Sequence, residues 1–124
     1  CTEMACPLFV PVIEAGWETT EIASLIARKY LQTMNNINID TLILGCTHYS
    51  IMKKHILNCF KDDINIISSD ETIINKVNGT LKPAGKETIS KDIFYITDIP
   101  QKFNFLARRL LGNDIKNIIH INPL

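Results

Sequence analysis

The residue types best suited to chemistry stand together in this chain as Cys46, Thr47 and His48, directly after an apolar run that ends at Gly45. A deprotonated thiol is a base and a nucleophile, and a neighbouring imidazole can carry charge or relay a proton. The threonine hydroxyl adds a group that can bind a ligand. This combination predicts a reactive thiol.

The flanking residues predict how the thiol is positioned. Residues 41–44 form an uncharged aliphatic and β-branched run, typical of a strand covered on both faces, and Gly45 permits a tight exit from it. Residues 49–60 carry Met52, Ile56, Cys59 and Phe60 at helical spacing, which predicts a helix that begins just after His48. Ligand sites in open α/β sheets lie at such strand ends. The positive end of the helix would favour the Cys46 thiolate and a substrate carboxylate.

Each of these residues also has a structural interpretation. A cysteine beside an apolar strand is often a small buried hydrophobic residue, and Thr47 is a good helix N-cap. An isolated histidine such as His48 is more often a surface or hydrogen-bonded residue. The chemical interpretation is favoured because all three stand together at a strand-to-helix junction.

Residues 44–49, with the sequence LGCTHY, resemble the second catalytic motif of bacterial glutamate racemases. Residues 5–16 resemble the upstream segment of that family, which ends in a glutamate and a glycine. Residues 94–103 and Leu111-Gly112 resemble its carboxyl-terminal strand, helix and glycine. The chain departs from the family at Ser50, where proline is usual, and at Asp98-Ile99, where glycine-aspartate is frequent; neither change removes a chemical group.

The resemblance implies cofactor-independent conversion of L-glutamate to D-glutamate for peptidoglycan synthesis, by a mechanism with two thiol bases. Cys46 would be one catalytic base, with Thr47 beside it in substrate binding. His48 would assist proton exchange at the thiol, and Glu14 would orient His48 or influence its charge. Without the resemblance, Glu14 would be interpreted as an exposed carboxylate at a strand end. No cofactor and no metal ion are implied.

An amino-terminal half of the family pattern is missing, with its aspartate-serine motif and its first catalytic cysteine. We therefore expect the 124-residue chain, which begins at Cys1, to be a fragment that is inactive alone. The expected fold is α/β, a mainly parallel sheet flanked by helices. Residues 1–80 would form part of the second racemase domain and residues 81–91 a linker. Residues 92–124 would return to complete the first domain. Expected partners are glutamate, the missing half and a second copy in a homodimer, all in the cytoplasm.

Periodicity and turn residues predict the remaining elements. A strand interrupted by Pro11 is expected over residues 8–13, and a helix capped by Thr19 or Thr20 is expected to run to about Met34, with Ile22, Leu25, Ile26, Lys29 and Tyr30 at helical spacing. A strand over 64–67 precedes a helix with a Ser68–Glu71 capping box, ended by Asn78-Gly79. A strand over 93–97, a helix from Pro100 and a strand over 118–121 complete the pattern.

Composition narrows the function classes. The formal net charge is zero, which gives no electrostatic basis for binding nucleic acid or an anionic membrane. The four cysteines have irregular spacing, which disfavours disulfides and zinc; Cys6 and Cys59 are predicted as core thiols and His55 as a surface residue. Two alternatives remain open. One is an aspartate or other amino acid racemase of the same superfamily, disfavoured because those typically have glutamate at position 48. The other is a non-enzymatic binding or redox module that uses Cys46.

Overall fold

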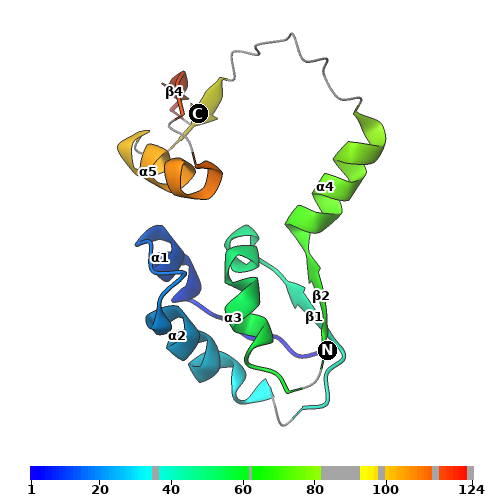
Figure 1. The fold of residues 1–124 in the computed structure, drawn as a ribbon. Coiled ribbons are helices and arrows are strands. Elements are labelled where there is room, and N and C mark those ends of the chain that lie inside the picture. Colours follow the sequence, from blue (N-terminus) through cyan, green and yellow to red (C-terminus); the bar gives the residue numbers. More distant parts are fainter. Residues whose placement is uncertain (35–36, 62, 82–92, 98–99, 113–114, 123–124) are drawn as a thin grey trace. The chain divides into compact units, whose positions relative to one another are not determined.

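The computed structural model describes residues 1–34, 37–61, 63–81, 93–97, 100–112 and 115–122 (Figure 1). It divides into two compact units, Cys1–Lys82 and Pro83–Leu124. The first unit contains α1 (Phe9–Glu14), α2 (Glu21–Leu31), β1 (Thr41–Leu44), the 3-10 helix η2 (Thr47–Met52), α3 (Lys53–Leu57), β2 (Asn65–Ser68) and α4 (Ser69–Thr80). The second contains β3 (Phe94–Ile96), α5 (Pro100–Leu111) and β4 (Ile118–His120).

The strand predicted over residues 8–13 is wrong, because this segment forms helix α1. Pro11 lies in the first turn of α1, where a backbone N–H has no partner within the helix, so proline is tolerated there. The helix ends at Glu14, and Gly16, two residues later, has a left-handed φ of 84°. The amide of Gly16 donates to the Ile13 carbonyl and that of Trp17 to the Val12 carbonyl, which is the Schellman pattern that glycine favours.

Helix α2 confirms the prediction of a helix after Thr20, although it ends at Leu31 rather than near Met34. Its buried face consists of Ala23, Ala27 and Leu31, whereas Ile22 and Leu25 are exposed. Ile26 and Tyr30 pack against the core cluster, so the predicted face is confirmed only in part. Small alanines allow close approach to neighbouring elements, and the spacing of large apolar side chains does not reveal them.

Strands β1 and β2 pair in parallel, with Leu44 opposite Ser68 at their carboxyl ends. Both strands were predicted within one or two residues. The expectation that β1 is covered on both faces is wrong, since Ile43 is 69% exposed and its neighbour in register, Ile67, is 43% exposed. Leu44 is buried and Leu42 packs against the core cluster, so one face of this pair is covered.

The core of the first unit fixes the segment that carries Cys46 and His48. Phe9 of α1 is 1% exposed and contacts the ring edges of Tyr30 and Tyr49, at centroid distances of 5.6 and 5.1 Å. Met52 and Ile56 are buried in the same cluster. Such edge-to-face aromatic pairs add to the free energy gained by burial. They hold η2 against α1.

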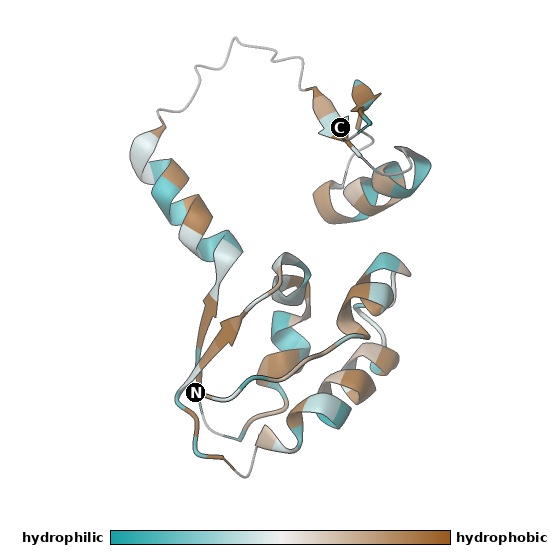
Figure 2. Cartoon of the chain, turned by 180° about the vertical axis from the view of Figure 1, so that it is seen from behind, coloured by the Kyte–Doolittle hydropathy of each residue, from teal (hydrophilic) through white to brown (hydrophobic). Residues whose placement is uncertain are grey.

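Helix α4 runs on directly from β2, away from α1, α2 and α3 (Figure 1). Ser68 is its N-cap residue but makes no side-chain capping bond, so the predicted capping box is not formed. The helix continues to Thr80, past the end predicted at Asn78-Gly79. None of its residues is buried, and Figure 2 shows hydrophobic segments along it and on both strands.

In the second unit, β3 and β4 pair in parallel, with Phe94 opposite Ile118, and α5 connects them. The two strands and the helix beginning at Pro100 confirm the predictions for this region. Within α5, Ala107 is buried, and the Phe103 ring lies 6.2 Å from that of Phe94. Gly112 follows the helix with a left-handed φ of 76°.

The structure as a whole is α/β with small parallel sheets. Residues 82–91 of the predicted linker and Asp98-Ile99 lie outside the described residues, as do Asn35-Asn36, a pair whose sequence is typical of a turn. Across the described ranges, no helix combines the length and apolar character needed to cross a membrane.

Candidate active site

Cys46 lies where the sequence predicts it, at the carboxyl end of β1. It is the N-cap residue of η2, with an extended backbone at φ −134° and ψ 137°. Gly45 does not have a left-handed φ, and a Cβ added to it would meet nothing within 4 Å. The backbone at the end of β1 therefore does not require glycine at position 45, although a tight exit from the strand was expected there. Instead, the backbone before Cys46 borders open space.

The thiol, the imidazole and the carboxylate named from the sequence lie in a row. Cys46 Sγ is 3.9 Å from His48 Nδ1, and His48 Nε2 is 3.8 Å from Glu14 Oε1. The side chains of His48 and Glu14 are 36% and 32% exposed, and Cys46 is half-buried. Each nitrogen of one imidazole therefore faces a different titratable group, an arrangement that allows a proton to move between thiol and ring.

The helix after Cys46 differs from the one expected. It begins at Thr47 rather than at Tyr49, its first six residues are a 3-10 helix, and α3 ends at Leu57. Met52, Ile56 and Cys59 are buried as the spacing indicated, and Phe60 packs against the same cluster. A short 3-10 turn has few aligned peptide dipoles, so the helix-dipole argument for an anion at Cys46 loses most of its force. Thr47 is exposed beside the thiol.

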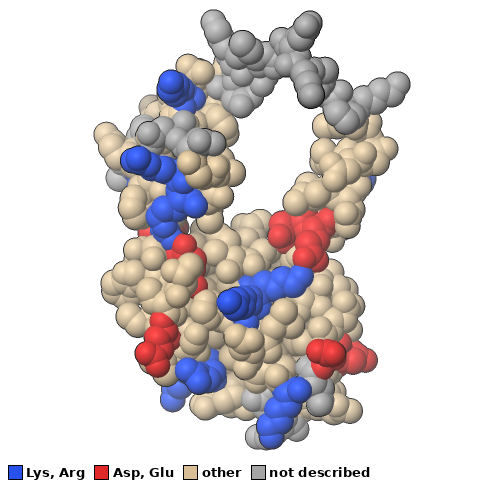
Figure 3. All heavy atoms as spheres, in the orientation of Figure 1, with Lys and Arg blue, Asp and Glu red and all other residues tan. Residues whose placement is uncertain are grey.

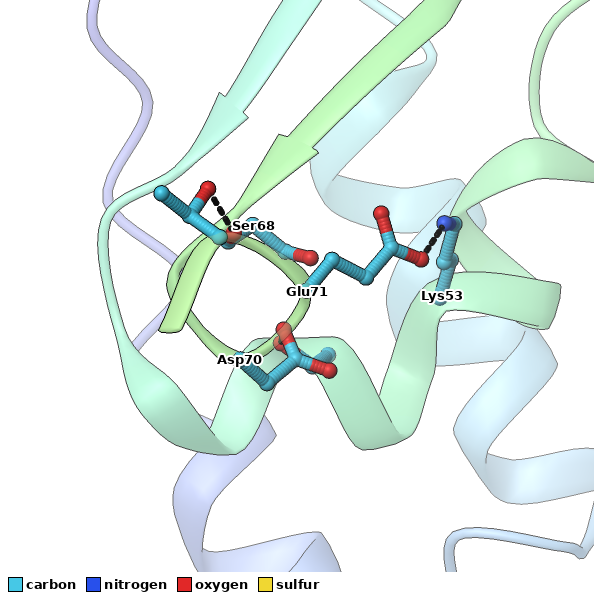
Figure 4. Close-up of polar contacts among 6 residues, drawn as sticks. Lys53, Ser68, Asp70 and Glu71 are labelled. Atoms are coloured by element: carbon cyan, nitrogen blue, oxygen red, sulfur yellow. Dashed lines mark hydrogen bonds and ion pairs between the residues drawn. The ribbon is translucent and has the colours of Figure 1, made fainter. Parts of the chain in front are cut away.

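Side chains from α4 hold the turn that carries His48. The Ser50 hydroxyl donates to Asp70 Oδ1 at 2.6 Å, and Lys53 Nζ pairs with Glu71 Oε1. Figure 4 shows Glu71 pointing toward Lys53, with Asp70 on the same turn of α4, and Figure 3 shows acidic and basic side chains adjoining there. The bond from Ser50 lowers the pKa of Asp70 below its ordinary value. Sequence reasoning missed these links because their partners are 20 and 18 positions apart.

Tyr49 adds a further hydrogen bond to this turn, because its hydroxyl donates to the Cys6 carbonyl at 3.2 Å. Burial raises the pKa of this phenol above its ordinary value. The residue directly after His48 is thus fixed both by this bond and by its ring contact with Phe9. The backbone that carries Cys46 and His48 is consequently anchored by α1 as well as by α4.

The other cysteines differ from Cys46 in burial. Cys6 and Cys59 are 4% and 9% exposed, and burial raises the pKa of each thiol, so both are held as neutral core thiols, as predicted. His55, predicted as a surface residue, is half-buried, and both of its ring nitrogens lie at hydrogen-bond distance from a partner. Its Nδ1 lies 2.8 Å from Ser24 Oγ, and its Nε2 lies 2.6 Å from the Glu18 carbonyl.

Trp17, which follows α1, is 49% exposed, and His120 is exposed in β4. Among the described residues, no group of three or more His, Cys, Asp and Glu side chains is arranged to hold a metal ion.

Comparison of sequences identifies similar proteins. No family model matches the chain. It is 32% identical to a glutamate racemase from Geobacter metallireducens over 124 residues, covering 95% of this chain and 45% of that protein. It is 41% identical to a glutamate racemase from a Sulfurihydrogenibium species over 114 residues, covering 92% of this chain and 42% of that protein. The chain thus spans less than half the length of these curated relatives.

Solved structures of glutamate racemases are also similar to this chain. Glutamate racemase isoform RacE1 from Bacillus anthracis superposes with a TM-score of 0.73 at 30% identity, covering 96% of this chain and 46% of that one. Glutamate racemase from Francisella tularensis, in complex with D-glutamate, superposes with a TM-score of 0.69 at 31% identity, covering 94% of this chain and 45% of that one. Sequence and structure together identify the chain as a homologue of glutamate racemase that matches roughly half of that enzyme.

Proposed function

We propose that this chain supplies one of the two acid/base faces of a glutamate racemase, with Cys46 as the group that exchanges the α-proton. The main support is the row of Cys46, His48 and Glu14 at the carboxyl end of β1, with spacings of 3.9 and 3.8 Å. The similarity to glutamate racemases over more than nine tenths of the chain supports glutamate as the substrate.

The chemistry requires two opposed groups. A proton on a carbon beside a carboxylate is a very weak acid, so a base must be in contact with it and the developing carbanion must be stabilised. Inversion requires removal of the proton on one face and delivery of another on the opposite face. Cys46 as a thiolate takes the α-proton and becomes a thiol, while a second thiol on the opposite face gives its proton to carbon and becomes a thiolate.

Within this chain the three other residues support that exchange. His48 holds or returns a proton next to the sulfur, and Glu14 orients the His48 ring. Thr47 is exposed beside Cys46, where its hydroxyl binds the substrate carboxylate. No step in this scheme needs a metal ion or an organic cofactor.

The second base comes from polypeptide outside this chain, because the family resemblance assigns it to a cysteine in the missing half, and Cys6 and Cys59 are buried. The 124-residue chain alone is therefore inactive. In the complete cytoplasmic enzyme, residues 1–80 belong to the second domain, and residues 92–124 return to the first. That enzyme forms a homodimer and provides D-glutamate for peptidoglycan.

The test is to supply the missing half from a similar glutamate racemase, fused to this chain or as a second polypeptide, and to measure D-glutamate formed from L-glutamate. We expect activity from the pair and none from either part alone. Activity on L-aspartate but not on glutamate would favour the alternative amino acid racemase. No racemisation of either substrate by a soluble, folded pair would leave a binding or redox role for Cys46 and contradict the proposal.

A further inference from the structure

A second polar cluster lies between α2 and α3, apart from the row at Cys46. It is a surface notch of about 130 Å³, lined by Ser24, Arg28, His55, Asn58 and Cys59. Helices α2 and α3 lie side by side in the first unit (Figure 1). The proposed racemisation uses none of the five residues, so the notch needs its own explanation.

His55 forms a fixed polar wall of the notch. Its Nε2 faces the Glu18 carbonyl at 2.6 Å, and because a carbonyl oxygen only accepts, this nitrogen carries the ring proton. In the neutral ring Nδ1 is then an acceptor, and the Ser24 hydroxyl donates a hydrogen bond to it at 2.8 Å. With both nitrogens bonded, the ring has one tautomer and one orientation. Neither His55 nor the Ser24 proton is free to move toward a ligand.

The remaining groups favour a negative ligand. Arg28 follows Ser24 by one turn of α2, and its guanidinium is exposed. It brings a positive charge to the notch, and none of the five lining side chains is a carboxylate. The exposed amide of Asn58 adds N–H donors from the opposite side. Cys59 adds no negative charge, because burial raises its pKa and its thiol donates to the His55 carbonyl at 3.2 Å.

The volume of the notch also suits a small anion. A volume of about 130 Å³ exceeds that of the one or two waters that fill a typical structural cavity, and it accommodates a single phosphate or carboxylate group. A planar guanidinium matches the paired oxygens of such groups with two parallel hydrogen bonds.

We propose that the notch lined by Ser24, Arg28, His55, Asn58 and Cys59 is a second ligand site of this protein, which binds a small oxyanion through Arg28 and Asn58. Ser24 and His55 form its rigid floor. The site is independent of the proposed racemase chemistry, since it is complete within α2, α3 and the residues that follow α3.

The test uses the full 124-residue chain and two probes, inorganic phosphate and acetate, each titrated at constant ionic strength against chloride. The side-chain signals of Arg28 and the ring signals of His55 are followed by NMR. We expect saturable shifts with at least one probe. Saturation with phosphate alone identifies a phosphorylated ligand, whereas saturation with acetate as well extends the class to carboxylates.

Matched variants make the test specific. Arg28→Gln should weaken binding about tenfold or more, because it removes charge-assisted hydrogen bonds. Lys29→Gln removes an adjacent exposed charge on α2 that does not line the notch, and it should bind as the unmodified chain does. Asn58→Ala should weaken binding without a change in net charge. The proposal would be overturned by NMR shifts that never saturate with either probe, or by equal losses of binding in Arg28→Gln and Lys29→Gln.

Discussion

Helices α2 and α4 have nearly the same length, 11 and 12 residues, yet they differ in what they bury. Helix α2 packs Ala23, Ala27 and Leu31 into the core, whereas α4 buries nothing and exposes Ile73, Ile74 and Val77, each more than 40%. The exposed side chains on α4 recur at helical spacing, which is typical of a face that packs against another element. The first unit thus combines a region with its own core, formed by α1, α2 and α3, with a helix whose apolar face is exposed among the described residues of that unit.

This difference bears on the proposed function. The region with its own core also anchors the turn of Cys46 and His48, through Phe9 and Tyr49. The turn can therefore be held in place within this chain, while the apolar side chains of α4, Ile43 and Ile67 are exposed in the described part of the first unit. An anchored turn beside exposed apolar faces agrees with a chain that matches roughly half of glutamate racemase.

The largest expected effect compares one substitution in the two regions. Ile56 of α3 is 1% exposed, and Ile74 of α4 is 55% exposed. Ile56→Ala should lower the free energy of unfolding by about 2–5 kcal/mol, through lost burial and a cavity. Ile74→Ala should change it by less than about 0.5 kcal/mol. Urea unfolding followed by circular dichroism measures both. Equal losses at the two positions would show that α4 is packed in solution.

Thiol reactivity should separate the packed region from the site. Cys1 is exposed and Cys46 half-buried, whereas Cys6 and Cys59 are held as buried thiols with raised pKa values. We expect Cys46 to be alkylated about a hundredfold faster than Cys6 or Cys59, because the buried thiols react only when the structure opens. Mass spectrometry of the alkylated peptides gives the four rates. A Cys46 rate as low as that of Cys59 would place its sulfur inside the core.

A smaller effect is expected for the ion pair that joins α3 to α4. Lys53 and Glu71 are paired with side-chain exposures of 35% and 52%, so the pair should contribute about 0.2–1 kcal/mol. A double-mutant cycle of Lys53→Ala and Glu71→Ala measures this coupling, and it should shrink in high salt. Lys54→Ala is the matched control, since Lys54 is the exposed neighbour of Lys53. Full additivity of the two changes at low salt would mean that the pair does not hold α4.

The smallest expected effect concerns pH. The hydrogen bond from Ser50 lowers the pKa of Asp70 in the folded protein, so this group adds stability above its ordinary pKa, and the contribution is lost as the pH falls through the lowered value. In Ser50→Ala the NMR titration midpoint of the Asp70 carboxyl should rise toward the ordinary value. Ser69→Ala keeps the Ser50 bond and should leave the midpoint in place. An unchanged midpoint in Ser50→Ala would show that the bond is absent in solution.

The parts predictable from sequence are those with local signals. The position of Cys46 follows from a short apolar run that ends at Gly45, and the parallel strands follow from the alternation of strand and helix. Helix α1 was misassigned because a run of six mostly apolar residues has no distinct period, and Pro11 is compatible with a first turn. The environment of His55 depends on Ser24, which is 31 positions away, and no local pattern reports such a contact.

The family resemblance at residues 5–16 and 44–49 supplied what local signals did not, namely the pairing of Glu14 with His48 across 34 positions of sequence. Glu14 directly follows residues 8–13, which were wrongly predicted as a strand. The predicted secondary structure alone therefore could not place this carboxylate beside the imidazole of His48. Neither local sequence signals nor the family resemblance predicted the links from Ser50 to Asp70 and from Lys53 to Glu71.

The central claim is that the sulfur of Cys46 exchanges the α-proton of glutamate once the missing half is present. The most direct measurement is deuterium incorporation at the α-carbon of L- and D-glutamate in heavy water, for Cys46→Ala and for Cys1→Ala in the reconstituted pair. Cys1→Ala removes an exposed thiol outside the site and should exchange normally. Exchange should be lost in Cys46→Ala with at least one enantiomer; full exchange of both enantiomers in that variant would contradict the account.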